Sequence, residues 1–357
     1  MRELAGVLGV VLVLAMLAEF FVTFLLPRRV RREPRIARGL NRFLWRRWRR
    51  VAMSLKPGAA DTILGFFGPV ALLLPLVTWA VGIFLGYALL EWAVAGGAFS
   101  DRILFSSGLF LSAGSTEGSY GLRVVELLEA ATGVGVLFIV IGYLPAVYSS
   151  FSRRETAVSQ LAARAGAPPC AGVALKQVIG RQQWRELEQD LQKWEEWAAE
   201  LMETHLSYPQ LAFYRSQHVN QNWLAALTAM VDVAAFIKAT APEGKVRAAD
   251  LTYAIGRHAL ADLATQFRVK ASPAGRLSDA DFDRLYTIVE AATGDAVDHD
   301  AARAELAELR SHYEPNAEAL ARFLALELPD WVPVDLEAEL MRKPGVGVGG
   351  DGRDLVG

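Results

Sequence analysis

Residues 100–117, SDRILFSSGLFLSAGSTE, lie between two long apolar blocks and decide how the chain is organised. The stretch is too apolar for an exposed loop and too short for another membrane span with its turns. Ser100 and Asp101 are residue types that begin helices, so we expect a short helix through Phe110 or Leu111. Irregular backbone at membrane depth is tolerated only where protein buries it or water reaches it. The Gly/Ser/Thr-rich residues that follow therefore predict a re-entrant helix with a pore-lining segment after it.

Three apolar blocks, residues 4–26, 63–92 and 124–148, are candidates to cross the bilayer, which takes about 20 helical residues. The second block contains Pro69 and Pro75, which allow a kinked helix. A cleavable signal peptide is the alternative for the first block, but the apolar run continues past Glu19 without a clear cleavage site. Glu19, an acid inside a span, is either a functional residue or a side chain that snorkels or pairs with a neighbouring helix.

The segment between the first two blocks holds most of the positive charge. Between Arg28 and Lys56 there are eleven Arg and one Lys but a single acid, Glu33. The segment therefore has a net charge of +11, in a chain whose net charge is −2. The positive-inside bias keeps this segment in the cytoplasm, with the N-terminus outside and the C-terminal domain cytoplasmic. Arg153 and Arg154, directly after the third block, agree with this orientation. We expect a multi-pass protein of the cell (inner) membrane.

Aromatic residues alternate with the basic ones in this segment, at Trp45 and Trp48. Such a pattern also occurs in nucleic-acid-binding proteins. Between two membrane spans, however, contact with anionic lipid headgroups is the favoured interpretation. We therefore expect membrane lipids as partners near Arg28 to Arg50, and no nucleic acid.

After Glu155 the composition becomes that of a soluble helical domain. One apolar helix face is predicted by residues recurring three and four apart: Trp184, Leu187, Leu191, Trp194, Ala198 and Leu201. Further periodic stretches cover residues 223–237, 251–267, 282–292 and 301–328. The prediction is an all-α membrane protein with three spanning helices, a re-entrant pore helix and a soluble helical C-terminal domain. Its parts are an N-terminal transmembrane helix (1–27), a basic cytoplasmic linker (28–60), a pore domain (61–154), a cytoplasmic helical domain (155–340) and a disordered tail (341–357).

The sequence gives no pattern of catalytic or metal-binding residues. Cys170 is the only cysteine, so it forms neither an intrachain disulfide nor a multi-thiolate metal site. The histidines show no metal-type spacing: His205, His218, His258, His299 and His312. We expect no enzyme, no metal site and no cofactor apart from a permeant cation.

Three motifs carry a resemblance to a known family: EAATG at residues 129–133, IGYLP at 141–145 and FSRRE at 151–155. They are similar to the inner helix of bacterial two-membrane-helix, pore-loop potassium channels, here with an additional N-terminal span. The stretch 207–224 also resembles the cytoplasmic domain attached to some of these channels, and the resemblance covers roughly residues 61–240. It implies a homotetrameric ion channel with the pore on the symmetry axis, passing potassium or another monovalent cation.

The resemblance also places the selectivity filter. Filters of this family read Thr-x-Gly-x-Gly-Asp, and the collinear residues are Ser112, Ala113, Gly114, Ser115, Thr116 and Glu117. Thr116 replaces the second glycine, whose backbone angles a β-branched residue does not reach easily. A second register, with Thr116, Gly118, Tyr120 and Gly121, leaves almost no linker before the third block. The resemblance thus implies a selectivity filter that departs from the family pattern. It also places the carboxylate of Glu117 near the outer mouth of the pore.

Within the third block, Gly133 and Gly135 are candidates for a gating hinge and Pro145 for a kink near a cytoplasmic gate. Close packing of small residues between helices is the alternative for both glycines. Two other functions remain open. One is a non-conducting membrane sensor or scaffold derived from a channel, and the other is a membrane-anchored binding module.

Overall fold

The computed structural model describes residues 1–24, 36–109, 119–179, 184–218, 220–242, 247–273, 275–293 and 296–333. Every regular element within these ranges is a helix. The chain divides into two compact units, Met1–Ser149 and Ser150–Gly357. The predicted disordered tail lies outside the described ranges.

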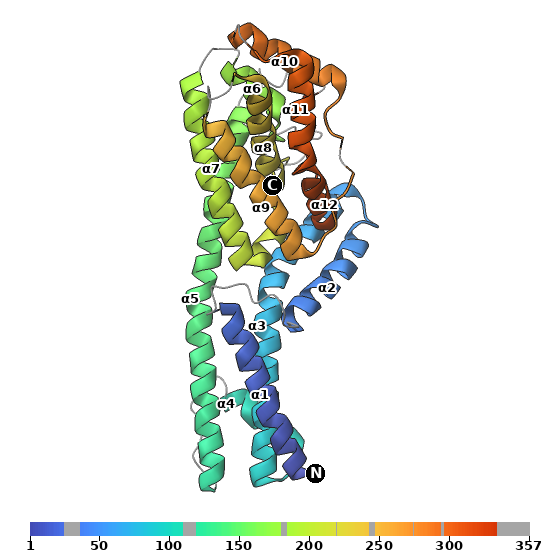
Figure 1. Ribbon diagram of the computed structural model, residues 1–357. Helices are drawn as coiled ribbons and strands as arrows, with labels where there is room; N and C mark the ends of the chain where they lie inside the picture. The colour runs from blue at the N-terminus through green and yellow to red at the C-terminus, as the bar shows by residue number, and fades with distance from the viewer. Residues whose placement is uncertain are drawn as a thin grey trace, which may run out of the picture. The chain divides into compact units, whose positions relative to one another are not determined.

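The first unit consists of long helices and one short one (Figure 1). It contains α1 (Arg2–Phe24), α2 (Ile36–Ala52), α3 (Pro57–Ala95), α4 (Phe99–Leu109) and the first part of α5 (Tyr120–Ala165). The 39 residues of α3 extend over about 58 Å, well beyond the roughly 30 Å of a hydrocarbon core. The 11 residues of α4 extend over only about 16 Å, so α4 is too short to cross.

The short helix begins slightly earlier than the sequence predicted. Ser100 and Asp101 lie within its first turn rather than before it, and the Ser100 hydroxyl contacts the Asp101 carboxylate at 3.2 Å. Ser100 therefore does not serve as the expected cap. Trp92 and Arg102 instead hold the preceding turn, by donating to the carbonyls of Gly97 at 3.0 Å and Gly96 at 3.2 Å.

Four helices of the described chain are long and apolar enough to cross a membrane: α1, α3, α5 and α8 (Trp223–Thr240). This is consistent with an all-α membrane protein. The fourth was not among the expected spans. Of its 18 residues 94% are buried within the chain, against 17% of the most apolar 18 residues of α5. We therefore describe α8 as the core helix of the second unit.

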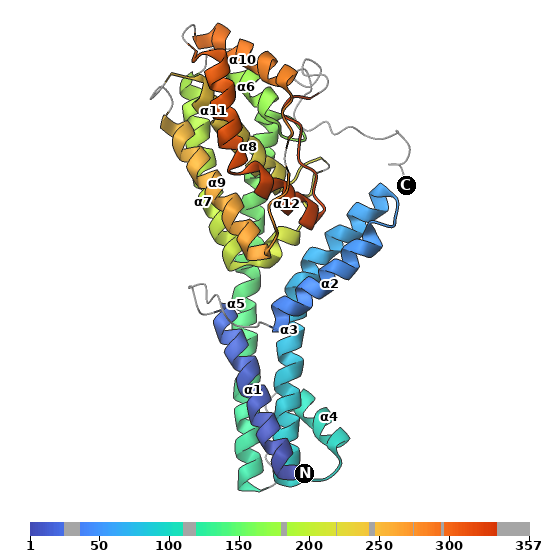
Figure 2. The ribbon, with the colours of Figure 1, turned by 45° about the vertical axis from the view of Figure 1, so that its right-hand side comes forward.

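Glycines bring α1 and α3 into direct backbone contact. The two helices run antiparallel along the second half of α3 (Figure 2), with Phe20 against Trp79 at one end and Gly6 against Ala93 at the other. A Cβ atom on Gly9 would lie 2.6 Å from the carbonyl oxygen of Gly86. Small residues permit this approach, and apolar helices in lipid associate largely through such packing.

The first half of α3 is covered by α2, which the sequence predicted only as a basic linker. Trp45 is 2% exposed and stacks on Phe67 with ring centroids 4.8 Å apart. The Trp48 indole donates to the carbonyl of Ile63 at 2.8 Å, and the Asn41 amide to that of Ala71 at 3.1 Å. Residues spaced three and four apart thus give the Arg-rich segment one packing face.

The second unit is built around α8. It contains the end of α5, α6 (Ala171–Ile179), α7 (Trp184–Ser207), the 3-10 helix η1 (Pro209–Phe213), α8, α9 (Arg247–Phe267), α10 (Asp279–Thr293), α11 (His299–Ser311) and α12 (Glu314–Leu324). Every residue of α8 except Lys238 is buried. On α7 the predicted apolar face is confirmed, because Leu187, Leu191, Trp194, Ala198 and Leu201 are all buried. Cys170 is buried in the same core.

A charge-balanced network lies at the centre of this core. Arg276 donates to both carboxylate oxygens of Asp232, at 2.8 and 2.9 Å, and Tyr313 donates to one of them at 2.5 Å. Glu314 pairs with Arg276 at 3.1 Å and with Arg310 at 2.8 Å. Two acids and two guanidinium groups therefore neutralise each other away from water, as buried charges require.

Replacing Gly9 with Ala tests the contact between α1 and α3. The added methyl would clash with the backbone of α3, so we expect Gly9→Ala to destabilise the protein by about 1–3 kcal/mol. Thermal unfolding in detergent, followed by tryptophan fluorescence, measures the change. Gly142→Ala is the control, because its Cβ would meet nothing within 4 Å. Equal stability of the two variants would contradict the close contact.

Replacing Asp232 with Asn tests the buried network. Removing Asp232 leaves two guanidinium groups against the single acid Glu314, so we expect Asp232→Asn to lower the free energy of unfolding by about 3–5 kcal/mol. The control is Asp250→Asn, whose ion pair with Lys238 is solvent-exposed and is expected to contribute at most about 1 kcal/mol. Denaturant unfolding of the full chain in detergent distinguishes the two. Similar losses would show that the network does not stabilise the core.

Candidate functional site

The predicted filter residues, Ser112, Ala113, Gly114, Ser115, Thr116 and Glu117, lie outside the described residues. The helices on either side of them are described, and these define the candidate site. α4 ends at Leu109, just before the segment, and α5 begins at Tyr120, just after it.

The predicted gating residues all lie within α5, which continues through them as one helix. Gly133 is buried, which fits the packing alternative, whereas Gly135 and Pro145 are exposed. A Cβ on Gly135 would meet no described atom within 4 Å. Close packing within this chain therefore gives no reason for a glycine at position 135.

One serine joins the short helix to both long ones. Ser106 of α4 is fully buried, and its hydroxyl lies 2.8 Å from the carbonyl oxygen of Phe84 in α3. The same hydroxyl makes a short hydrogen bond to Oε1 of Glu129 in α5. A second polar link between α3 and α5 joins the hydroxyls of Tyr87 and Thr132 at 2.9 Å. Polar contacts of Ser106 therefore attach α4, the helix before the predicted filter, to α3 and α5.

Carboxyl groups gather at this junction. Glu91 of α3 and Glu129 of α5 are both fully buried. Glu126 of α5 is 5% exposed. Arg102 of α4 is the nearby cation that attracts Glu91 and Glu126. Ionisable residues inside membrane segments are costly and are functional candidates by default.

The sequence itself carries a signal for these three acids. Glu91, Glu126 and Glu129 are acids inside otherwise apolar blocks, the same feature that drew attention to Glu19. Glu19 lies in α1, where it is half-buried. Nothing in the sequence distinguished Ser106 from Ser107, because only the three-dimensional position of Ser106 shows its role.

The basic face of α2 is separate from its packing face. Trp45 and Trp48 contact α3, whereas Arg46, Arg47 and Arg50 are exposed. The tryptophans thus serve packing within the chain, and the arginines are left for solvent or for anionic groups.

Arg154 lies in the interior of the second unit and not on its surface. It is 3% exposed and donates to the carbonyls of Leu211 at 2.8 Å and Tyr214 at 3.0 Å. His205 faces it at 3.4 Å between Nε2 and the Arg154 Nη1. Arg153 pairs with Glu200. The two arginines that agreed with a cytoplasmic orientation are therefore anchored within the helical unit.

The stretch 207–224 contains residues that hold helix ends. Arg215 donates to the carbonyl of Ala325 at 2.8 Å, at the end of α12. Asn222 caps α8 by accepting from the amide of Ala225 at 2.7 Å. The Trp223 indole donates to the carbonyl of Ala212 at 3.3 Å. These side chains therefore stabilise the fold of the second unit.

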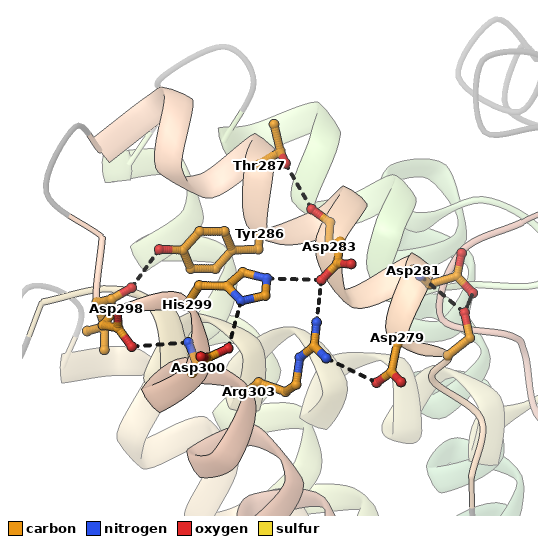
Figure 3. Close-up of polar contacts among 11 residues, drawn as sticks. Asp279, Asp281, Asp283, Tyr286, Thr287, Asp298, His299, Asp300 and Arg303 are labelled. Atoms are coloured by element: carbon orange, nitrogen blue, oxygen red, sulfur yellow. Dashed lines mark hydrogen bonds and ion pairs between the residues drawn. The ribbon is translucent and has the colours of Figure 1, made fainter.

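A cluster of acids surrounds His299 on α10 and α11 (Figure 3). Its Nε2 lies 2.9 Å from Asp283, which also accepts from Arg303 at 2.6 Å, and its Nδ1 lies 3.3 Å from Asp300. Hydrogen bonds to Asp300 and Asp283 raise the pKa of His299. In the part of the chain that the structure describes, no group of three or more His, Cys, Asp or Glu residues could hold a metal ion. The cluster is an ion-pair network that joins α10 and α11.

The pKa of His205 gives a test of the Arg154 contact. Burial and the neighbouring guanidinium lower this pKa to about 3, while an unfolded histidine titrates near 6.5. As pH falls from about 6.5 to about 3, the unfolded chain gains a proton that the folded chain does not. We therefore expect stability to fall in this window by up to roughly 1.4 kcal/mol per pH unit from this residue.

Denaturant unfolding at several pH values in detergent measures this slope. His205→Gln is expected to make the slope shallower in the same window. His218→Gln, at an exposed position, is the control and should leave the slope unchanged. An unaltered slope in His205→Gln would show that His205 is not the neutral partner of Arg154.

The described helices thus bring together a short helix, two long apolar helices and a set of buried acids. No protein-family model matches the chain, and no curated protein or solved structure matches it.

Proposed function

We propose that the chain forms a passive, cation-conducting channel of the potassium channel type, assembled as a homotetramer. The single observation that carries the proposal is the position of α4. This helix is too short to cross the bilayer, and buried Ser106 attaches it to α3 and α5 directly before residues 112–117. A short helix held between two long apolar ones is the layout that a re-entrant pore loop needs.

The chemistry of such a loop favours cations. A helix carries partial negative charge at its C-terminal end, and α4 ends where the predicted filter begins. Backbone carbonyls after it would replace water around a dehydrating monovalent ion. The carboxylate of Glu117 at the outer mouth would raise the local cation concentration.

The surface of α5 supports assembly from several copies. Large apolar side chains of this helix are exposed in the single chain: Leu127 at 71%, Phe138 at 70%, Ile141 at 57% and Tyr148 at 69%. Lipid covers some of them, and neighbouring copies of α5 around a shared axis would cover others. In this arrangement Gly135, which has open space beside it, would face the axis or a neighbouring subunit.

The proposed orientation follows from charge. The N-terminus lies outside, and α2 lies at the cytoplasmic face with Arg46, Arg47 and Arg50 toward anionic headgroups of the inner membrane. The helical unit then lies in the cytoplasm. Gating would involve α5, because the same helix supplies residues to both units.

A second candidate function is a non-conducting sensor or scaffold that kept the channel architecture. The observation favouring it is Thr116, which occupies the position of the second filter glycine.

Ion flux through the purified protein in liposomes tests the proposal. With potassium, sodium or chloride gradients, we expect cation flux above that of empty vesicles, and loss of this flux in Gly114→Val. Gly58→Ala is the control, since its Cβ would meet nothing within 4 Å and it lies at the start of α3. Absence of flux from a sample shown to be tetrameric, under several gating conditions, would favour the scaffold.

Restoring a glycine tests the filter. We expect Thr116→Gly to increase potassium flux relative to sodium flux, because glycine reaches the backbone angles that a regular filter uses. Ser115→Gly, one residue earlier, is the matched control and should not raise this ratio. The same liposome assay measures both. An unchanged ratio in Thr116→Gly would contradict the collinear register of the filter.

A further inference from the structure

His299 of the second unit contacts an acid through each nitrogen of its ring. It is the first residue of α11 and points toward α10 (Figure 3). Its Nε2 lies 2.9 Å from Oδ1 of Asp283 on α10, and its Nδ1 lies 3.3 Å from Oδ1 of Asp300 on α11. The ring also lies edge-on to the rings of Phe282 and Tyr286 on α10, with centroids 5.3 and 4.9 Å apart. One side chain thus joins the start of α11 to α10.

The two acid contacts together require a charged ring. An ionised carboxylate only accepts hydrogen bonds, and a neutral imidazole has a single N–H to donate. Only the imidazolium, with an N–H on each nitrogen, can donate to Asp283 and Asp300 at the same time. The geometry therefore selects the protonated form of a residue whose charge changes near neutral pH.

The surrounding groups are mostly acidic. The charged and titratable side chains around His299 come from α10, from α11 and from the residue that caps α11: Asp279, Asp283, Tyr286, Asp298, Asp300 and Arg303. Arg303 and the N-terminal end of α11 disfavour a positive ring. Arg303 is itself paired with Asp279 at 3.6 Å and with Asp283 at 2.6 Å. The acids prevail, and the hydrogen bonds to Asp300 and Asp283 raise the pKa of His299.

The contact lies where α10 covers the core of the second unit. Phe282, Leu285 and Val289 of α10 are buried, and the Phe282 ring lies 6.0 Å from that of Phe236 in α8. A further polar link holds α10, because the Tyr286 hydroxyl donates to the carbonyl of Val297 at 2.7 Å. Helices at the edge of a domain open locally at a lower free energy than the core does. Weakening one link to α11 therefore changes how often α10 opens.

We propose that His299 is a pH-sensitive latch that holds α10 on the second unit. In the protonated form the ring joins Asp283 to Asp300. As the pH rises above the ordinary histidine value near 6.5, the ring loses one N–H, and one of the two acids loses its donor. α10 then opens more often and uncovers the apolar face that carries Phe282 and Val289. The latch lies within the second unit and does not depend on whether the chain conducts ions.

The test is hydrogen–deuterium exchange of the α10 backbone amides in the full chain in detergent, between about pH 6 and about pH 8.5. Protection is expressed relative to an unstructured reference at the same pH. The raised value for His299 means that its contribution is fully present below about pH 6.5 and is lost above it. We expect wild-type protection to fall by about twofold to fivefold across this range, the scale of an exposed ion pair.

Two variants separate the latch from ordinary packing. His299→Gln is neutral throughout, so its α10 protection is expected not to change with pH. Asp300→Asn alters a side chain that is 94% exposed, and its amide can donate to a neutral ring as well as accept from a charged one. It is therefore expected to show a smaller fall than the wild type. His258→Gln is the control, because this exposed histidine lies on α9 and should leave the α10 profile unchanged.

Three results would overturn the proposal. One is wild-type α10 protection that stays constant or rises between the two pH values. Another is a fall in His299→Gln as large as that of the wild type, and the last is an undiminished fall in Asp300→Asn. Because ion flux is not the readout, failure here leaves the channel proposal to its own test.

Discussion

Hydrocarbon offers no hydrogen bonds, so every polar group that enters a membrane must find its partner within the protein. The first unit follows this constraint at the junction of α3, α4 and α5. Ser106, Tyr87 and Thr132 meet polar partners there, and Glu129 accepts a hydrogen bond from Ser106. Apolar surface alone would let these helices slide, whereas the contacts of Ser106 fix α4 against α3 and α5.

The second unit meets the same requirement in its buried core. Asp232, Arg276, Tyr313 and Glu314 come from α8, the loop before α10, and the beginning of α12. The contacts satisfy charges that would otherwise prevent burial. Both units therefore combine extensive apolar packing with a small polar centre. In each case the polar centre joins segments that are far apart in the sequence, which apolar periodicity does not reveal.

Sequence patterns predicted most of the helices, but neither α2 and α6 nor the contacts between helices. The spacing of Leu187, Leu191 and Leu201 predicted the buried face of α7, because burial follows the helical period. The packing face of α2 was missed because its many arginines dominate the composition, although Trp45 and Trp48 are spaced for it. α8 was expected as a soluble helix and is buried on all sides. The role of Ser106 follows from its contact with Glu129. The sequence alone does not predict this contact, because it depends on the three-dimensional arrangement of α4 and α5.

The position of Asp232 has a consequence for biosynthesis. α8 is as long and nearly as apolar as a membrane span, and it follows spans that the insertion machinery has already handled. Asp232 lies at the middle of its 18 residues, where an acid costs about 2.5–3.5 kcal/mol on transfer into the bilayer. In the folded unit the same carboxylate is neutralised by Arg276. One side chain thus disfavours the lipid destination during synthesis and stabilises the folded core afterwards.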